Sequence, residues 1–183
     1  MKRKHAAALA LAFAAAAWPA ASHSMDLGDF YAGASLGQSK LRDCGLPGCD
    51  DKDTAWRIFG GYQFDRHFSA ELGYHDFGKA GFTGGDIKAN AWELVGIAAW
   101  PINEQFSIYG KAGGFRGETK DSGLAGRKET NSDFTYGAGV QYDVTRNVGL
   151  RVEWQRYQNL GGASLGGGRD VDVFGVGILW RFR

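Results

Sequence analysis

The stretch HFSAELGYHDFG, residues 67–78, carries the pattern that decides the fold. Its apolar residues recur at every second position, so in an extended strand they all lie on one face. These residues are Phe68, Ala70, Leu72 and Tyr74. Glu71 lies on the opposite face, between small and polar neighbours. A carboxylate in the middle of such a strand requires water or cationic partners on its side of the sheet.

Seven further segments show the same two-residue alternation, and most have the length of about 9 to 11 residues that a tilted strand needs to cross a bilayer. The even-numbered residues form the apolar face in every segment. Helical patterns are hard to find in a chain with 29 glycines. The eight predicted strands are 30–38, 55–64, 68–77, 90–100, 106–116, 134–142, 148–157 and 172–182.

The connections between these segments alternate in length. Short turns follow the second, fourth and sixth strands, at 65–67, 101–105 and 143–147. Long polar connections follow the other strands, at 39–54, 78–89, 117–133 and 158–171. Short turns at one end and long loops at the other are typical of an up-and-down barrel. The sequence therefore predicts an all-β fold, an eight-stranded antiparallel up-and-down β-barrel, with no segment left for a second domain.

Periodicity alone leaves two kinds of barrel open: a soluble binder with its apolar face inward, or a transmembrane barrel with its apolar face outward. The polar face is rich in glycine and serine, which suit the narrow interior of an eight-stranded barrel. Bulky aromatic residues gather at the short-turn ends of the apolar face and predict an interfacial girdle. The girdle residues are Phe30, Phe64, Phe68, Trp100, Phe106, Tyr142, Trp180 and Phe182. These features favour the transmembrane barrel.

Seven charged residues fall on the polar face, and their signs nearly cancel. They are Arg57, Glu71, Glu93, Lys111, Arg151, Glu153 and Arg181. An Arg or Lys at the lipid midplane costs roughly 2–4 kcal/mol, and several would use up a net stability of about 5–15 kcal/mol. The charges are therefore expected to face the lumen, with Arg57, Lys111 and Arg151 as partners of Glu71. Such a network is either a structural plug or part of a transport path, and the sequence leaves both open.

The first 24 residues form a predicted secretory signal peptide. A basic start is followed by an Ala/Leu/Phe run at 6–17, a break at Trp18, and small residues that allow cleavage after Ser22 or Ser24. The barrel domain is then expected at 25–183. The whole chain has 21 basic and 20 acidic residues, a balance that gives no sign of a nucleic-acid partner.

Several stretches together resemble the membrane domain of the outer-membrane protein A (OmpA) family, over nearly all of the chain after the predicted signal peptide. They are DDKDTAWRIFGGYQFDRHFSAELGYHDFGK, WPINEQFSIYGKAGG, FTYGAGVQYDVT, VGLRVEWQRY and VFGVGILWRF. The resemblance implies an eight-stranded barrel in a Gram-negative outer membrane with both termini periplasmic. Members of the family serve structural and adhesive roles, or act as narrow or gated pores.

The resemblance also assigns individual residues. Glu71, Lys111 and Arg151 match members of the family's lumenal ion-pair network. The family's gating lysine on the fourth strand falls at Ile97, and its acidic partner on the sixth strand falls at Gln141, so an OmpA-type gate is not expected. The peptidoglycan-binding C-terminal domain of full-length OmpA is not expected in this chain either. Arg183 follows Phe182, where the family resemblance leads us to expect a terminal aromatic.

The remaining candidate sites give no catalytic, cofactor or metal assignment. Cys44 and Cys49 lie in the first long connection, and in an oxidising compartment a pair at this spacing is expected to form a disulfide. The acids around them, Asp43, Asp50, Asp51 and Asp53, are interpreted as hydrated loop residues. His67 and His75 are possible bases of a hydrolase, but no serine nucleophile is apparent beside either.

The sequence thus predicts a non-enzymatic outer-membrane barrel that supports envelope integrity or surface interaction through its outer loops. A narrow channel is the alternative, and a lipid-A-modifying enzyme is third. The expected partners are outer-membrane lipid and lipopolysaccharide, with a host or surface ligand at the outer loops, and the chain is expected to be a monomer. Phosphate contacts of lipopolysaccharide are expected at rim cations. These are Arg116, Lys120, Arg127, Lys128, Arg156 and Arg169.

Overall fold

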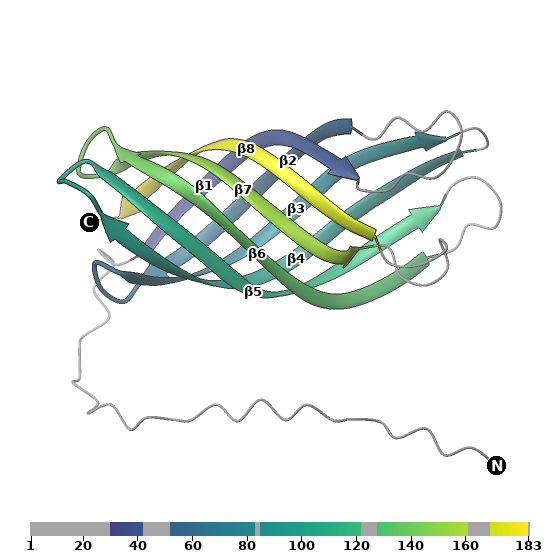
Figure 1. Ribbon diagram of the computed structural model, residues 1–183, viewed down its shortest axis with the longest axis horizontal. Helices are drawn as coiled ribbons and strands as arrows, with labels where there is room; N and C mark the ends of the chain where they lie inside the picture. Colours follow the sequence, from purple (N-terminus) through teal and green to yellow (C-terminus); the bar gives the residue numbers. More distant parts are fainter. Residues whose placement is uncertain (1–29, 42–51, 83–84, 122–127, 161–168, 183) are drawn as a thin grey trace, which may run out of the picture.

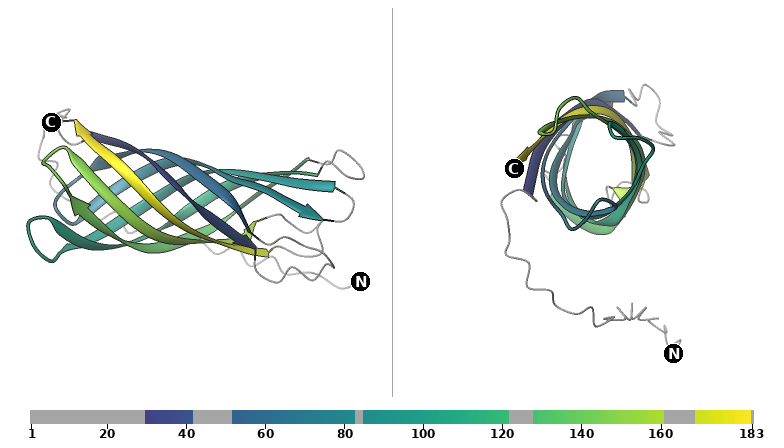
Figure 2. Two further views of the ribbon diagram at one scale, coloured as in Figure 1. Left: turned by 90° about the horizontal axis from the view of Figure 1, so that it is seen from above. Right: turned by 90° about the vertical axis from the view of Figure 1, so that its left-hand side faces the viewer.

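The chain forms one closed antiparallel barrel in the computed structural model, which describes residues 30–41, 52–82, 85–121, 128–160 and 169–182 (Figure 1). Each strand pairs with the next in sequence, and β8 pairs with β1, so the ring seen from its end in Figure 2 has no free edge. The strands are β1 (Phe30–Leu41), β2 (Lys52–Gln63), β3 (Phe68–Phe82), β4 (Gly85–Pro101), β5 (Phe106–Asp121), β6 (Lys128–Asp143), β7 (Val148–Leu160) and β8 (Arg169–Phe182). The predicted fold is confirmed.

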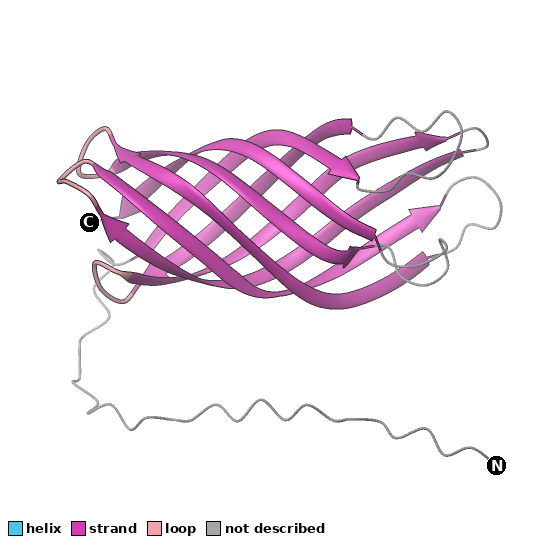
Figure 3. Ribbon diagram, viewed as in Figure 1, coloured by secondary structure: helices cyan, strands magenta, loops and turns pink. Residues whose placement is uncertain are grey.

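Strands make up almost all of the described chain (Figure 3). Across the described ranges, no helix is long and apolar enough to span a membrane. The predicted signal peptide and the pair Cys44 and Cys49 lie outside the described residues.

At the end of the barrel that carries the long connections, the strands extend further than the alternating pattern predicted. The predicted connection 78–89 is mostly strand, because β3 continues to Phe82 and β4 begins at Gly85. The predicted connection 117–133 is likewise shortened, since β5 ends at Asp121 and β6 begins at Lys128. In β5 and β6 the apolar pattern stops because the residues at 117–121 and 128–133 are almost all polar, and in β3 and β4 it stops because apolar residues no longer keep one parity, as at Phe82 and Ile87. The backbone hydrogen bonds of the ladder do not depend on that pattern. The predicted boundaries were therefore wrong at these two connections, and by three residues at each end of 39–54 and 158–171, since β1 ends at Leu41, β2 begins at Lys52, β7 ends at Leu160 and β8 begins at Arg169.

Two irregularities lie near the outer ends of β3 and β7. The register shifts between Asp76 and Lys79, where Gly78 has a φ of 77°. It shifts again between Tyr157 and Leu160, where Asn159 has a φ of 49°. Glycine and asparagine adopt this left-handed region more readily than other residues. The second bulge turns Leu160 into the lumen although its number is even, and Leu160 is buried there.

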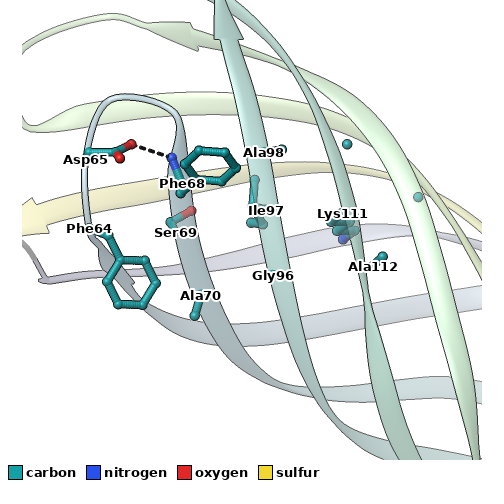
Figure 4. Close-up of a pocket in the computed structure, with 12 residues that line it drawn as sticks. Phe64, Asp65, Phe68, Ser69, Ala70, Gly96, Ile97, Ala98, Lys111 and Ala112 are labelled. Atoms are coloured by element: carbon teal, nitrogen blue, oxygen red, sulfur yellow. Dashed lines mark hydrogen bonds between the residues drawn. The ribbon is translucent and has the colours of Figure 1, made fainter. Parts of the chain in front are cut away.

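The three short turns share one hydrogen-bonding design. In the first, the Asp65 carboxylate accepts the backbone N–H groups of His67 at 2.6 Å and Phe68 at 2.8 Å, the latter drawn in Figure 4. Asn103 and Thr145 occupy the same position in the other two turns and accept the corresponding pairs of N–H groups. In each turn, the carbonyl of the last residue also accepts an N–H group from the strand after the hairpin. These bonds tie neighbouring hairpins together at this end.

The predicted girdle residues point outward at the short-turn end of the barrel. Trp100 is 68% exposed and Phe64 is 64% exposed, while Phe106 is half-buried. Between the bulky rings the outer surface is hollowed over small residues of β3 to β5, such as Ala70, Gly96 and Ala112 (Figure 4). At this end of the barrel the outward face thus presents aromatic and aliphatic side chains to lipid, and the charged residues in the middle of the strands, such as Glu71 and Lys111, are buried on the inner face.

Candidate functional site in the lumen

Arg57 of β2 lies at the centre of the lumen and contacts three carboxylates from three different strands. Its Nη2 atom is 2.7 Å from Glu71 Oε2 and 2.6 Å from Glu93 Oε1. Its Nη1 atom is 3.4 Å from Glu153 Oε1. The side chains of Arg57, Glu71 and Glu93 are completely inaccessible to solvent. One guanidinium therefore joins β2, β3, β4 and β7 across the interior.

Two further cations complete the cluster. Lys111 Nζ of β5 is 2.8 Å from Glu153 Oε2. Arg151 of β7 is ion-paired with Glu71 through Nη1 and donates from Nε to Gln141 Oε1 at 2.8 Å. Three cations face three carboxylates, so the formal charge of this cluster is zero. Buried charges are tolerated when they are paired in this way. We call these six residues, Arg57, Glu71, Glu93, Lys111, Arg151 and Glu153, the lumenal network.

Hydroxyl and amide groups occupy other lone pairs of the carboxylates. The hydroxyl of Tyr31 donates to Glu71 Oε1 at 2.9 Å, and that of Tyr109 donates to Glu153 Oε2 at 2.9 Å. Glu93 Oε2 accepts from Tyr157 at 2.5 Å and from the Gln155 amide at 2.6 Å. All four donors are buried. Each carboxylate of the network is therefore held by at least one neutral donor as well as by cations.

Aromatic rings flank the two buried guanidinium groups. The guanidinium carbon of Arg57 is 4.4 Å from the ring centroid of Phe59. That of Arg151 lies between the rings of Tyr31, Phe59 and Tyr109, at 5.2 to 5.5 Å from their centroids. Cation–π contacts of this kind strengthen when water is excluded. They also fill the space around the charges, which fixes the side chains in place.

Glycines make room for these large side chains, because bulky and small residues face each other across the strands. Tyr31 is opposite Gly61, and Tyr109 is opposite Gly139. A Cβ on Gly73 would lie 3.0 Å from Glu93 Oε1 and 3.1 Å from Arg57 Nε, closer than side chains normally pack. Gly73 therefore lets the central ion pair pass directly over the backbone of β3.

Beyond the network, toward the long connections, the interior becomes apolar. Tyr157 is completely buried, and its ring contacts Phe77, Phe115 and His75 at centroid distances of 4.8, 5.1 and 5.3 Å. We call the surrounding buried cluster the apolar plate. Its members are Ala55, Phe77, Ala91, Phe115, Tyr157, Leu160, Val171 and Val173. The hydroxyl of Tyr157 reaches the network, so the two layers are in direct contact.

The structure brings six of the seven predicted lumenal charges together. The seventh, Arg181, lies apart near the short turns, where its Nη2 atom is 2.8 Å from Asp143 Oδ1. At the two positions of the family's gate, Ile97 packs with Val95 and Tyr109, and Gln141 accepts from Arg151. Neither side chain offers Glu71 or Arg151 a charged alternative partner.

The inner aromatic residues and His75 were not predicted from the sequence as parts of this site. All of them are odd-numbered, like the other inward-facing residues. That each ring lies opposite glycines on the neighbouring strands can be recognised only when the register of the strands is known. The register is visible only once strands are paired, as between Gly33, Phe59 and Gly73. His75 is buried against Phe77 and Tyr157, and His67 lies in an exposed turn.

On the outward surface near the long connections, Arg156 forms a two-pronged ion pair. Its Nε and Nη2 atoms are 2.7 and 3.0 Å from the two carboxylate oxygens of Asp172. Its guanidinium carbon also lies 5.2 Å from the Trp154 ring. Arg116 is also even-numbered and is exposed on the same outward face. Within the described residues, no group of three or more His, Cys, Asp or Glu side chains is placed to hold a metal ion.

Comparison with known proteins gives one consistent result. The family model for the OmpA-like transmembrane domain matches residues 26–183. Outer membrane protein A of Salmonella typhi is 30% identical over 195 residues, which cover 98% of this chain and 55% of that protein. Outer membrane protein A of Escherichia coli O157:H7 is 30% identical over 191 residues with the same coverage. The chain thus spans about half the length of the curated relatives it matches.

Solved structures with lower identity share the fold. Neisserial surface protein A superposes with a TM-score of 0.70 at 18% identity, covering 84% of this chain and 97% of that one. Ail, the attachment invasion locus protein of Yersinia pestis, superposes with a TM-score of 0.59 at 21% identity, covering 85% and 99%. At this level of identity the likeness extends to the barrel and no further.

Proposed function

This chain belongs to the family of OmpA-like transmembrane domains, and we propose that it acts in the Gram-negative outer membrane as a closed, rigid anchor for the long connections at one end of its barrel. The role is envelope integrity or surface interaction, with the long connections outside the cell and both termini in the periplasm. The lumen supplies structure in this proposal and does not serve as a path for solutes.

One observation carries the proposal: the lumen is filled across its section by side chains with almost no exposed surface. Arg57 and Glu71 are 0% exposed, and Lys111 is 3% exposed. The adjacent apolar plate is equally inaccessible to bulk solvent, with Tyr157 at 0%. A conducting pore requires a continuous hydrated path, whereas packed and paired side chains stabilise the barrel.

The outward surface supports lipopolysaccharide as the lipid partner. Cations on the outward face gather toward the long connections, with Lys40, Lys88 and Arg116 exposed and Arg156 half-buried. The girdle at the other end consists of aromatic residues. Phosphate groups in the outer leaflet would accept charge-assisted hydrogen bonds from this rim.

The experiment uses cells that lack the protein and are then supplied with the natural chain or with a loop-shortened variant. In the variant, short turns replace residues 42–51, 122–127 and 161–168. Survival in bile salts measures envelope integrity. Binding of the cells to immobilised heparin measures surface interaction, a probe chosen because Ail was solved with the heparin analogue sucrose octasulfate.

Restored survival with both chains would support the structural role. Heparin binding that requires the long connections would support the surface role. Both readings require the unboiled variant to keep the gel mobility of a folded barrel. If the natural chain restores neither property and instead increases the uptake of small solutes, the anchor proposal is wrong and the channel alternative replaces it.

A further inference from the structure

Five buried polar atoms in or beside the network have no hydrogen-bond partner among the described residues. They are Arg57 Nε, His75 Nδ1, His75 Nε2, Glu93 Oε1 and Gln155 Oε1. Buried polar atoms are nearly always paired with protein or with ordered water. Five such atoms in one region therefore indicate a bound molecule rather than five separate defects.

These atoms belong to side chains in mutual contact. Arg57 and His75 are directly opposite each other on β2 and β3, both facing inward. Glu93 Oε1 lies 2.6 Å from Arg57 Nη2 but outside hydrogen-bond geometry, which leaves a lone pair available. Gln155 reaches the other oxygen of Glu93 at 2.6 Å. The orphan atoms thus belong to one continuous group of side chains, which Tyr157 contacts through Glu93 and His75.

The mixture of donors and acceptors identifies the chemistry of the ligand. Arg57 Nε is a donor, and Glu93 Oε1 and Gln155 Oε1 are acceptors. The amide of Gln155 cannot reverse its roles, because its nitrogen donates to both Glu93 and Thr135. A neutral His75 adds one donor and one acceptor. The charges around the site already balance, so an additional ion would be uncompensated, whereas water can donate and accept at once.

The two ends of the lumen differ in the side chains that line them. At the short-turn end, a cavity of about 50 Å³ is lined by polar and apolar side chains, and the polar ones include Ser69, Gln141, Arg151 and Arg181. A cavity of that size can hold ordered water. On the other side of the orphan atoms lies the apolar plate, which offers water almost no partners and packs ring against ring.

We propose that the lumen is a blind chamber: it binds water at the five orphan atoms, receives that water from the short-turn end, and is sealed toward the long connections by the apolar plate. The barrier to permeation is then the plate, while the ion pairs of the network lie on its wet side. This inference deepens the proposed closed barrel and rests on it.

Transfer of nuclear magnetisation from water to the refolded chain in lipid nanodiscs tests the bound water. We expect transfer to the Arg57 Nε–H proton and to the His75 ring, and none to the methyl groups of Val171 and Val173 in the plate. The absence of transfer at Arg57 would overturn the water site. Transfer to the plate methyls would overturn the seal.

Single-channel recording tests where the barrier lies. The variant Phe77→Ala/Phe115→Ala thins the plate, and we expect it to show discrete openings that the natural chain lacks. Phe134→Ala/Phe174→Ala is the matched control, because it removes two rings that face outward with exposed fractions of 47% and 62%. The variant Lys111→Met/Glu153→Gln, which removes one pair of the network, should stay silent.

The possible failures are distinguishable. A folded plate variant that stays silent, with or without openings in the network variant, overturns the plate as the barrier and leaves the closed barrel standing. Openings in the natural chain overturn the proposed closed barrel itself. In that case the water transfer measured at Arg57 and at the plate methyls still decides whether the two layers differ in hydration.

Discussion

Glu71, the carboxylate in the middle of an otherwise ordinary strand, is a junction between strands. It pairs with Arg57 and Arg151 and accepts a hydrogen bond from Tyr31. The sequence indicated the side of the sheet on which it lies and the cations that were its candidate partners. Two of those candidates contact it, and Lys111 instead pairs with Glu153. The alternating pattern shows on which face of the sheet a charged residue lies, but the register of the strands determines which charged residues contact each other.

Replacing Glu71 should be costly because it leaves buried cations without a partner. We expect Glu71→Gln to lower the free energy of unfolding by roughly 3–5 kcal/mol, the cost of breaking a buried ion pair. The double variant Glu71→Gln/Arg151→Gln should lose clearly less than the sum of the two single variants, because the pair is removed together. Urea unfolding of the refolded barrel measures all three values. Strict additivity would contradict the coupling.

Gly73 and Gly96 offer a matched pair of substitutions. Gly73→Ala places a Cβ against Arg57 and Glu93, which are fixed by several contacts, and overpacking of this kind costs about 1–3 kcal/mol. A Cβ on Gly96 meets nothing closer than 3.9 Å. Gly96→Ala should therefore be neutral, or should stabilise the barrel by up to about 1 kcal/mol because alanine lowers the conformational entropy of the unfolded chain. The urea midpoints of the two variants report the difference. Equal losses would show that Gly73 has no special role.

At the scale of elements, the strand centres were predictable because one face must be apolar where it meets lipid. The strand ends were not predictable, since β3 and β4 continue to pair after the regular alternation stops. The bulges were equally hidden. Nothing in the sequence predicted that Asn159 adopts a positive φ and that Leu160 therefore points inward. The shared design of the short turns was visible in sequence only as Asp65, Asn103 and Thr145 at equivalent positions.

The first short turn should give stability a defined dependence on pH. The backbone N–H groups of His67 and Phe68 hold the pKa of Asp65 below its usual value. Stability from this carboxylate is therefore present above the ordinary aspartate pKa of about 4 and is lost as the pH falls through the lower folded value. Unfolding of the natural chain and Asp65→Asn between pH 7 and 2 measures this. A difference that does not shrink toward low pH would contradict it.

At the outer rim, the two outward arginines should respond differently to lipid. Arg116→Ser should lower barrel stability by roughly 1–3 kcal/mol in lipopolysaccharide and little in phospholipid, because it loses charge-assisted contacts to phosphate. Arg156→Ser should lower stability in both, because Asp172 loses its two-pronged partner. Thermal unfolding in the two lipids separates these cases. An equal loss for Arg116→Ser in both lipids would remove lipopolysaccharide as its partner.

At the scale of the whole molecule, the barrel combines two devices that close the same lumen. The lumenal network balances three cations with three carboxylates, and the apolar plate packs rings across the adjacent layer. The girdle aromatics and the small outward residues give the barrel an outer surface that is suited to contact with lipid. A family resemblance predicted a barrel with lumenal charges. It did not predict the plate, because inward aromatics are conspicuous only when the glycines opposite them are known.

Single-channel conductance of the refolded chain in a planar bilayer tests the closed barrel most directly, with Glu71→Gln recorded beside it. Both samples must first show the gel mobility shift between unboiled and boiled protein that marks a folded barrel. We predict a silent bilayer for the natural chain and for every folded molecule of Glu71→Gln, because the plate remains intact in both. Discrete openings of the natural chain that Glu71→Gln alters would contradict the account and make the lumenal network part of a pore.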